Sequence, residues 1–199
     1  MTEVKVPQIG AILLAAGGSS RLGRPKQLLQ YEGMTLLRRT SEMLAASVCD
    51  PIIIVLGAEH ELMQKELEGL SSVICINSEW KSGMSSSIRA GLRELLKIEP
   101  DIDAVMITLS DQPHITTADI DNFAHKYSRT RAPIIAAQYD GVAGVPALFS
   151  RAMFGALFEL EGDKGARDLI RRGNDGLVTI DLQIAAADID TEDDVDGLT

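Results

Sequence analysis

Short apolar runs alternate with longer amphipathic stretches along the whole chain. The runs are aliphatic and rich in β-branched residues, which is typical of buried strands. Strands are therefore expected at residues 9–15, 51–56, 73–76, 104–109, 133–139, 147–149 and 177–180.

The stretches between these runs carry apolar residues at helical spacing. The clearest of them places Ile88 and Leu92 on one face of a helix. Helices are expected at residues 36–46, 59–67, 84–97, from Thr116 or Thr117 to about 129, 151–159 and 165–172. Asp140-Gly141, together with Gly144, predicts a turn between two strands.

Strands separated by helices imply crossover connections and hence a mostly parallel sheet covered on both faces. The chain has no internal repeat or linker composition, so we expect one α/β domain over residues 1–199. In such sheets ligands bind beyond the carboxyl ends of the strands. Polar motifs follow the runs at 9–15, 73–76 and 104–109, so the site is expected where these strands end.

Composition narrows the class of ligand. The formal net charge is −10, whereas nucleic-acid binding needs a basic surface, so nucleic acid is not an expected partner. Cys49 and Cys75 lie in or beside apolar runs, and we expect packed thiols rather than a disulfide or a metal pair. No signal pattern precedes the first run and no apolar stretch approaches membrane-spanning length, so a cytoplasmic protein without a membrane partner is expected.

The first polar motif runs from Leu14 to Lys26 and combines glycines with two cations. Gly17 and Gly18 let the main chain approach a ligand closely, and Arg21 and Lys26 supply the charge that a polyphosphate requires. The order of residues is neither the Walker pattern nor the dinucleotide-binding pattern. These residue types predict a triphosphate-sized anion site, and the alternative is a surface turn with two solvated cations.

The motifs after the next strands also allow two interpretations each. Asp111 either holds Mg²⁺, which prefers carboxylates with phosphate oxygens and water, or caps a turn before Pro113. Residues 85–87 either cap the following helix or donate to an anion. Trp80 either stacks on a ligand or only covers the loop.

Four segments together resemble the molybdenum cofactor cytidylyltransferase branch of the nucleotidyltransferases. They are Leu14-Ala15-Ala16-Gly17, Pro25-Lys26-Gln27-Leu28-Leu29, Ser110-Asp111-Gln112-Pro113 and Gly162-Asp163-Lys164-Gly165-Ala166-Arg167. The resemblance implies a Rossmann-like three-layer domain of the nucleotide-diphospho-sugar transferase type. It also implies a nucleotide-binding half over about residues 9–130 and an acceptor-binding half over about 131–199.

The resemblance further implies a role for individual residues. The catalytic residues would be Arg21, Lys26 and Asp111, and the metal would be bound by Asp111 and Asp190. The remaining nucleotide-binding positions would be Leu14, Ala15, Ala16, Gly17, Gly18, Ser19, Asn77, Gly83 and Ser86. The acceptor-binding positions would be Gly144, Pro146, Gly162, Asp163, Gly165 and Arg167. The implied roles stay open at two positions. Val145 stands where the family pattern has His, and Asp190 equally suits the N-cap of a terminal helix.

The reaction implied by the resemblance joins CMP from CTP to a molybdopterin-type acceptor, with Mg²⁺ as cofactor and release of pyrophosphate. CTP is indicated by Ala16, where the guanylyl branch usually has Gly. A molybdoenzyme that receives the product would be a further partner. The alternatives are a transferase with GTP or another small phosphate acceptor, and a cofactor-delivery chaperone without catalysis.

Overall fold

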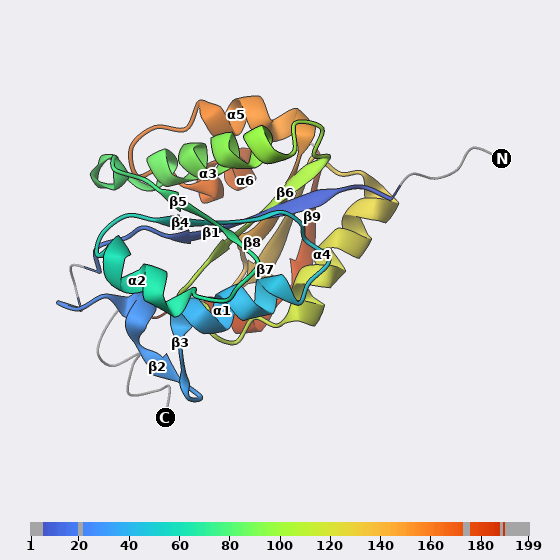
Figure 1. The fold of residues 1–199 in the computed structure, drawn as a ribbon. Helices are drawn as coiled ribbons and strands as arrows, with labels where there is room; N and C mark the ends of the chain where they lie inside the picture. Colours follow the sequence, from blue (N-terminus) through green and yellow to red (C-terminus); the bar gives the residue numbers. More distant parts are fainter. Residues whose placement is uncertain (1–5, 20–21, 173–175, 188, 190–199) are drawn as a thin grey trace.

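A central sheet with helices on both sides forms the body of the protein (Figure 1). The computed structural model describes residues 6–19, 22–172, 176–187 and 189. Seven strands form the sheet in the order β5-β4-β1-β6-β8-β7-β9. Their bounds are Ile9–Ala15 (β1), Ile52–Leu56 (β4), Val73–Ile76 (β5), Ala104–Leu109 (β6), Ile134–Tyr139 (β7), Val142–Ser150 (β8) and Leu177–Asp181 (β9).

The sheet is mostly parallel, as expected. β1 pairs in parallel with β4 on one side and with β6 on the other. Among the described strands of this sheet, only β8 runs antiparallel to its neighbours, β6 and β7. Every residue of β1 is buried, because helices cover both faces, and this explains its unbroken apolar sequence.

The helices form the two outer layers. Their bounds are Leu36–Ala45 (α1), His60–Glu66 (α2), Met84–Ile98 (α3), Thr117–Thr130 (α4), Phe154–Phe158 (α5) and Ala166–Arg172 (α6). One core cluster joins α1, α2 and α4 to the sheet, and a second joins α3, α5 and α6 to its opposite face (Figure 1). The expected three-layer α/β class is confirmed.

The helix α3 shows how sequence pattern and packing agree. Ile88, Leu92 and Leu95 repeat at helical spacing and are fully buried against the sheet. Gly91 lies on the same face, and a Cβ there would come within 2.7 Å of the Ile12 side chain. The glycine therefore allows α3 to approach the middle of β1 closely.

The strand β8 differs from the expectation. We expected a turn that included Gly144 and a short strand at 147–149, but the turn contains only Asp140 and Gly141, and β8 includes Gly144 and Pro146. Pairing with β7 shifts register between Ala136 and Ala137, which leaves Val145 and Pro146 outside the ladder. Since proline has no N–H to donate, it is tolerated at such a bulge inside a strand.

Several short elements carry no periodicity and were not predicted. A two-stranded hairpin of β2 (Gln30–Tyr31) and β3 (Met34–Thr35) follows the 3-10 turn η1 (Lys26–Leu28). Further 3-10 turns are η2 (Trp80–Ser82), η3 (Arg151–Met153) and η4 (Gln183–Ala186). No helix in the part of the chain that the structure describes is long and apolar enough to cross a membrane.

Candidate active site

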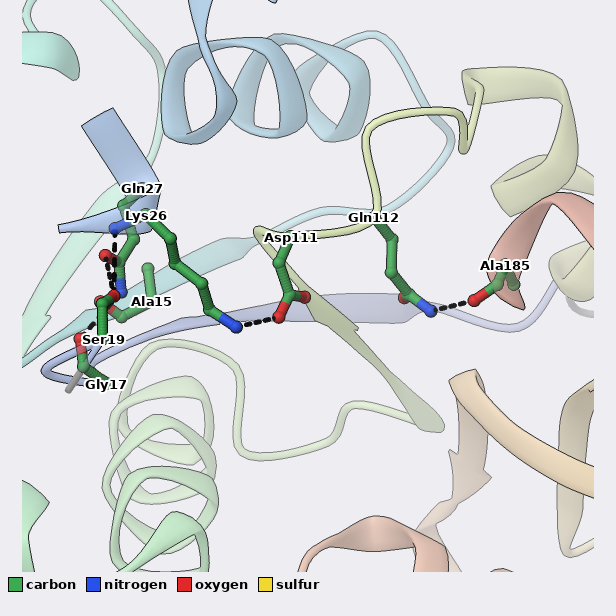
Figure 2. A network of polar contacts seen from close by, with 8 residues as sticks. All are labelled: Ala15, Gly17, Ser19, Lys26, Gln27, Asp111, Gln112 and Ala185. Carbon is green, nitrogen blue, oxygen red and sulfur yellow. Dashed lines mark hydrogen bonds and ion pairs between the residues drawn. The ribbon is translucent and has the colours of Figure 1, made fainter. Parts of the chain in front are cut away.

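The loop after β1 is closed by contacts with η1 (Figure 2). The Ser19 hydroxyl accepts a hydrogen bond from the main-chain N–H of Lys26, with an N–O distance of 3.0 Å. The Gln27 side-chain nitrogen donates to the main-chain oxygens of Ala15 and Gly17, at 3.2 and 2.9 Å. These contacts fold the loop that contains Gly17 and Gly18, here called the glycine loop, back over the carboxyl end of β1.

Lys26 and Asp111 bring the first and third motifs together. The Lys26 ammonium forms an ion pair with Asp111 Oδ2, and the two side chains are only 19% and 10% exposed (Figure 2). Asp111 follows β6, the immediate neighbour of β1, so parallel pairing places both residues at one edge of the sheet. A cation and a carboxylate 85 residues apart in sequence therefore share one partly buried position.

Asp111 also has an oxygen that is available to a metal. Its buried Oδ1 atom has no hydrogen-bond partner among the described residues, which is unusual for a buried polar atom. The described residues contain no group of three or more His, Cys, Asp or Glu that could hold a metal ion. A divalent ion held by one carboxylate, phosphate oxygens and water fits this arrangement.

The loop after β5 is fastened to the start of α3 by Asn77. Its side-chain nitrogen donates to the hydroxyls of Ser86 and Ser87, at 2.8 and 2.9 Å. The Ser86 hydroxyl in turn donates to the main-chain oxygen of Gly83 at 2.8 Å. Asn77 and Ser86 are both buried, so this network sets the path of the loop and the position of the first turn of α3.

Trp80 lies against the glycine loop. A Cβ at Gly18 would be 3.1 Å from the indole ring, and a Cβ at Gly57 would be 2.7 Å from the Cβ of Trp80. The Lys81 ammonium lies 5.4 Å from the centre of the indole ring, a cation–π contact. Trp80 thus joins the loops that follow β1, β4 and β5.

These loops surround a pocket at the carboxyl ends of β1, β5 and β6. Its cavity volume is about 360 Å³. Two lysines and two carboxylates are among the residues that line it, together with apolar side chains. The lining residues are Leu14, Ala16, Gly17, Gly18, Lys26, Gln27, Trp80, Lys81, Gly83, Met84, Ser87, Leu109, Ser110, Asp111 and Asp163.

One wall of the pocket comes from a distant segment. The main-chain oxygen of Gly162 accepts a hydrogen bond from the N–H of Ser85 at 3.2 Å. A Cβ at Gly83 would lie 2.4 Å from the carbonyl carbon and oxygen of Gly162. The segment that contains Asp163 is therefore held in main-chain contact with the start of α3.

Two of the expected acceptor positions, Arg167 and Gly144, lie close to Tyr139. Arg167, in α6, donates to the Tyr139 hydroxyl at 3.3 Å. A Cβ at Gly144 would lie 2.4 Å from the same hydroxyl, so only glycine leaves room for the tyrosine there. The main-chain oxygen of Val145, next to Pro146, accepts a hydrogen bond from Gln112 at 3.1 Å.

Comparison with known proteins decides the family. MobA-like NTP transferase domains match residues 11–177 of this chain. The chain belongs to this family. It is therefore a nucleotidyltransferase, an enzyme whose substrate is a nucleoside triphosphate, and the resemblance drawn from its motifs is confirmed at the level of the family.

Two similar proteins align with almost the whole sequence of this MobA-like transferase. The nicotine blue oxidoreductase of Paenarthrobacter nicotinovorans is 30% identical over 210 residues, which cover 98% of this chain and 96% of that protein. The molybdenum cofactor cytidylyltransferase of Escherichia coli (strain K12) is 28% identical over 187 residues, which cover 94% and 93%. The names of these relatives differ in reaction, so similarity alone does not assign the acceptor.

A solved structure shares the fold. Rv0371c from Mycobacterium tuberculosis H37Rv matches with a TM-score of 0.81 and 30% identity, over 96% of this chain and 97% of that one. Rv0371c in complex with manganese matches with a TM-score of 0.77 and 28% identity, over the same shares. The expected nucleotide-diphospho-sugar transferase type of fold is confirmed.

The structure divides the expected site residues of the transferase into three groups. Leu14, Ala16, Gly17, Gly18, Lys26, Gly83, Asp111 and Asp163 line the pocket. Ala15, Ser19, Asn77, Ser86, Gly162 and Arg167 make the supporting contacts described above. Gly165 packs against the Met84 side chain, and Gly144 and Pro146 are buried in β8.

Two expected residues, Arg21 and Asp190, lie outside the described residues. Ile189 is described, and its N–H donates to the main-chain oxygen of Asp111 at 3.2 Å. Ile189 is therefore held beside Asp111.

Sequence reasoning missed several residues at the pocket. Lys81, Met84 and Ser87 line it, and each lies within the polar segment that was expected to contact the nucleotide. Gln27 lines it as well, although it was used only as part of the family segment 25–29 and against the Walker pattern, and was given no role in the site. The available signal was a polar residue, Gln27, directly before an apolar pair. A polar side chain in such a place is buried only if it has specific hydrogen-bond partners, which suggests a role.

Proposed function

We propose that this MobA-like transferase joins CMP from CTP to a molybdopterin-type acceptor and releases pyrophosphate, with Mg²⁺ as cofactor. The observation that carries the proposal is the meeting of Lys26 and Asp111 in one pocket beside the glycine loop. This arrangement offers a cation for the triphosphate and a carboxylate for a metal at the same place.

The choice of CTP rests on two observations. Ala16 lines the pocket where the guanylyl branch usually has glycine, and its methyl group reduces the space for a base. A difference of one methyl group is worth only about 1–3 kcal/mol of discrimination. The similarity to the cytidylyltransferase of Escherichia coli supports the same donor.

The reaction needs positioning and charge neutralisation more than covalent catalysis. An oxygen of the acceptor phosphate forms a new bond to the α-phosphorus, and the bond from that phosphorus to the bridging oxygen of pyrophosphate breaks. Lys26 and the N–H groups of the glycine loop bind the triphosphate and offset the charge that develops on the leaving group. Arg21 has the same role in this proposal.

Asp111 is the proposed metal ligand, because its buried Oδ1 atom has no partner and faces no competing hydrogen bond among the described residues. When bound, Mg²⁺ would neutralise phosphate charge and orient the reacting phosphates. Asp190 is proposed as a second carboxylate for the same ion. Lys26 holds the Oδ2 atom of Asp111 and so fixes the orientation of the carboxylate.

The acceptor is proposed to bind on the side of residues 131–199, next to the nucleotide half at 9–130. The contact between Gly162 and Gly83 brings these two parts together at the pocket wall. The proposed acceptor positions are Gly144, Pro146, Gly162, Asp163, Gly165 and Arg167. Val145 offers no imidazole, so recognition of the pterin would rest on the other residues of this side.

The proposed setting is the cytoplasm, with no nucleic acid or membrane as partner and with a molybdoenzyme as receiver of the product. Direct transfer to such an enzyme would protect a labile cofactor.

The test is pyrophosphate release by the purified protein with Mg²⁺ and molybdenum cofactor, comparing CTP, GTP and ATP. We expect release with CTP and a cytosine dinucleotide product. Release with GTP alone would contradict the choice of donor. Binding of CTP without release would contradict catalysis on this acceptor, and oxidation or reduction of nicotine blue by the protein would favour the activity named for the Paenarthrobacter relative.

A further inference from the structure

Gln27 is a long polar side chain in an almost fully buried position. It is 1% exposed, and the residues on either side of it in η1 are more exposed. A buried amide is unfavourable unless its donors and acceptor are satisfied. The partners of Gln27 therefore indicate why an amide occupies this position.

Both partners of the Gln27 nitrogen belong to the glycine loop. They are the main-chain oxygens of Ala15 and Gly17, at 3.2 and 2.9 Å (Figure 2). In a planar trans peptide, the C=O of one residue and the N–H of the next point in opposite directions. Binding of these two oxygens by Gln27 therefore fixes the orientation of the N–H groups of Ala16 and Gly18, two residues that line the pocket.

The amide oxygen of Gln27 reaches the other end of the loop. It accepts a hydrogen bond from the Ser19 hydroxyl at 3.4 Å, and the same hydroxyl accepts from the N–H of Lys26 at 3.0 Å. Ser19 has a φ of 48°, a left-handed conformation that a non-glycine residue adopts only when its surroundings hold it. Only an amide offers both the donors and the acceptor that these contacts need.

We propose that Gln27 is a positioning residue that presets the N–H groups of the glycine loop for the phosphates of the nucleotide. It acts through Ala15, Gly17 and Ser19. The proposal rests on the proposed function only in that the ligand of the pocket is a polyphosphate. It does not depend on the base or on the acceptor.

The test compares the wild type with Gln27→Met and Gln27→Glu, using magnesium tripolyphosphate as the ligand. Trp80 is the only tryptophan and lies against Gly18, so its fluorescence reports binding. Calorimetry gives an independent dissociation constant. Since both hydrogen bonds from the Gln27 nitrogen are lost, we expect both variants to bind at least about tenfold more weakly at pH 8.

The pH dependence of Gln27→Glu separates hydrogen bonding from packing. A protonated carboxyl group has nearly the shape of the amide and can donate to one of the two carbonyls, whereas a carboxylate can only repel them. The affinity of Gln27→Glu relative to the wild type should therefore recover as the pH is lowered from 8 to 5. Gln27→Met, which has no proton to gain, should show no recovery relative to the wild type.

Tyr127→Phe is the matched control. Its hydroxyl is a buried donor to the main-chain oxygen of Asp103, before the start of β6 and at the opposite edge of the sheet. Loss of this hydrogen bond should lower the melting temperature but leave tripolyphosphate affinity unchanged. Circular dichroism of every variant, at both pH values, establishes that the protein is folded.

The outcomes are distinguishable. Wild-type affinity in a folded Gln27→Met, or no recovery of Gln27→Glu at low pH, would overturn the role of Gln27 and leave the proposed function intact. A wild type that binds neither tripolyphosphate nor CTP would instead overturn the polyphosphate site and the proposed function with it.

Discussion

Asp111 has one carboxylate oxygen bound by Lys26 and a second, buried oxygen that has no hydrogen-bond partner in the part of the chain that the structure describes. Asp111→Asn keeps the shape of the side chain but removes the charge that a divalent ion needs. We expect kcat for pyrophosphate release to fall by at least about a hundredfold, the loss typical for removal of an electrostatic contact to the transition state. Nucleotide affinity, measured by Trp80 fluorescence, should change by no more than about threefold, since Lys26 and the loop remain.

The control for this prediction is Asp121→Asn. Asp121 accepts a hydrogen bond from the N–H of Val48 and is not among the residues that line the pocket. Its substitution should leave both kcat and affinity unchanged. Unchanged turnover in Asp111→Asn, or equal loss of turnover and binding, would contradict a metal role for Asp111.

At the scale of elements, the start of α3 and the segment of Gly162 form one wall of the pocket. Gly83 makes their contact possible, because it has a φ of 99° and a Cβ there would lie 2.4 Å from the Gly162 carbonyl group. Gly83→Ala therefore adds backbone strain, about 1–3 kcal/mol, to a steric clash with main-chain atoms. We expect a loss of at least that free energy of unfolding in urea.

The same substitution should weaken nucleotide binding at least about tenfold, because relief of the clash must move one wall of the pocket. Gly155→Ala in α5 is the matched control, since no described residue beyond the helix's own backbone and the two chain neighbours comes within 4 Å of the added Cβ. It should leave affinity unchanged and raise stability by up to about 1 kcal/mol. Wild-type affinity in Gly83→Ala would show that this contact does not shape the pocket.

At the scale of the whole molecule, burial of Cys49 makes the free energy of unfolding fall as the pH rises in the alkaline range. Burial raises the pKa of the Cys49 thiol from 9.0 to about 11, against a smaller lowering by its contact with Ser47. The folded state therefore retains a proton that the unfolded state loses above pH 9. The resulting contribution to stability is complete below about pH 9 and is lost as the pH rises towards 11.

Urea unfolding at pH 8, 9.5 and 10.5 measures this effect. Between pH 9 and 11 the free energy of unfolding of the wild type should fall more steeply than that of Cys49→Ser, by up to about 1.4 kcal/mol per pH unit. Cys75→Ser is the control, because Cys75 is only half-buried and contributes less of the slope. Equal slopes for the wild type and Cys49→Ser would contradict the prediction.

Much of the fold could be predicted because burial leaves a local pattern. β1, β5 and β6 begin and end at the residues that their apolar runs indicated. In β1 and β6, helices and neighbouring strands exclude water over almost the whole run, whereas β5 is an edge strand whose residues are only partly buried. β8 could not be predicted in this way, because Gly144 and Pro146 are typical of turns and only the register shift against β7 accommodates them.

The site was predictable in part for the same reason. Lys26 and Asp111 stand in recognisable motifs, and parallel pairing of β1 with β6 brings them together. Asn77 and Ser86 were expected to contact the nucleotide; the structure shows that the Asn77 side chain donates a hydrogen bond to the Ser86 hydroxyl. Whether they reach the ligand remains a prediction.

The sequence by itself determined the alternation of strands and helices, the glycine loop and the residues that identify the family, because periodicity and short motifs are local properties. Only the tertiary structure decided that Gln27 supports that loop and that Gly162 meets Gly83. Contacts of this kind join segments through the packing of the sheet and its loops. They depend on the geometry of the assembled layers, which no single stretch of sequence contains.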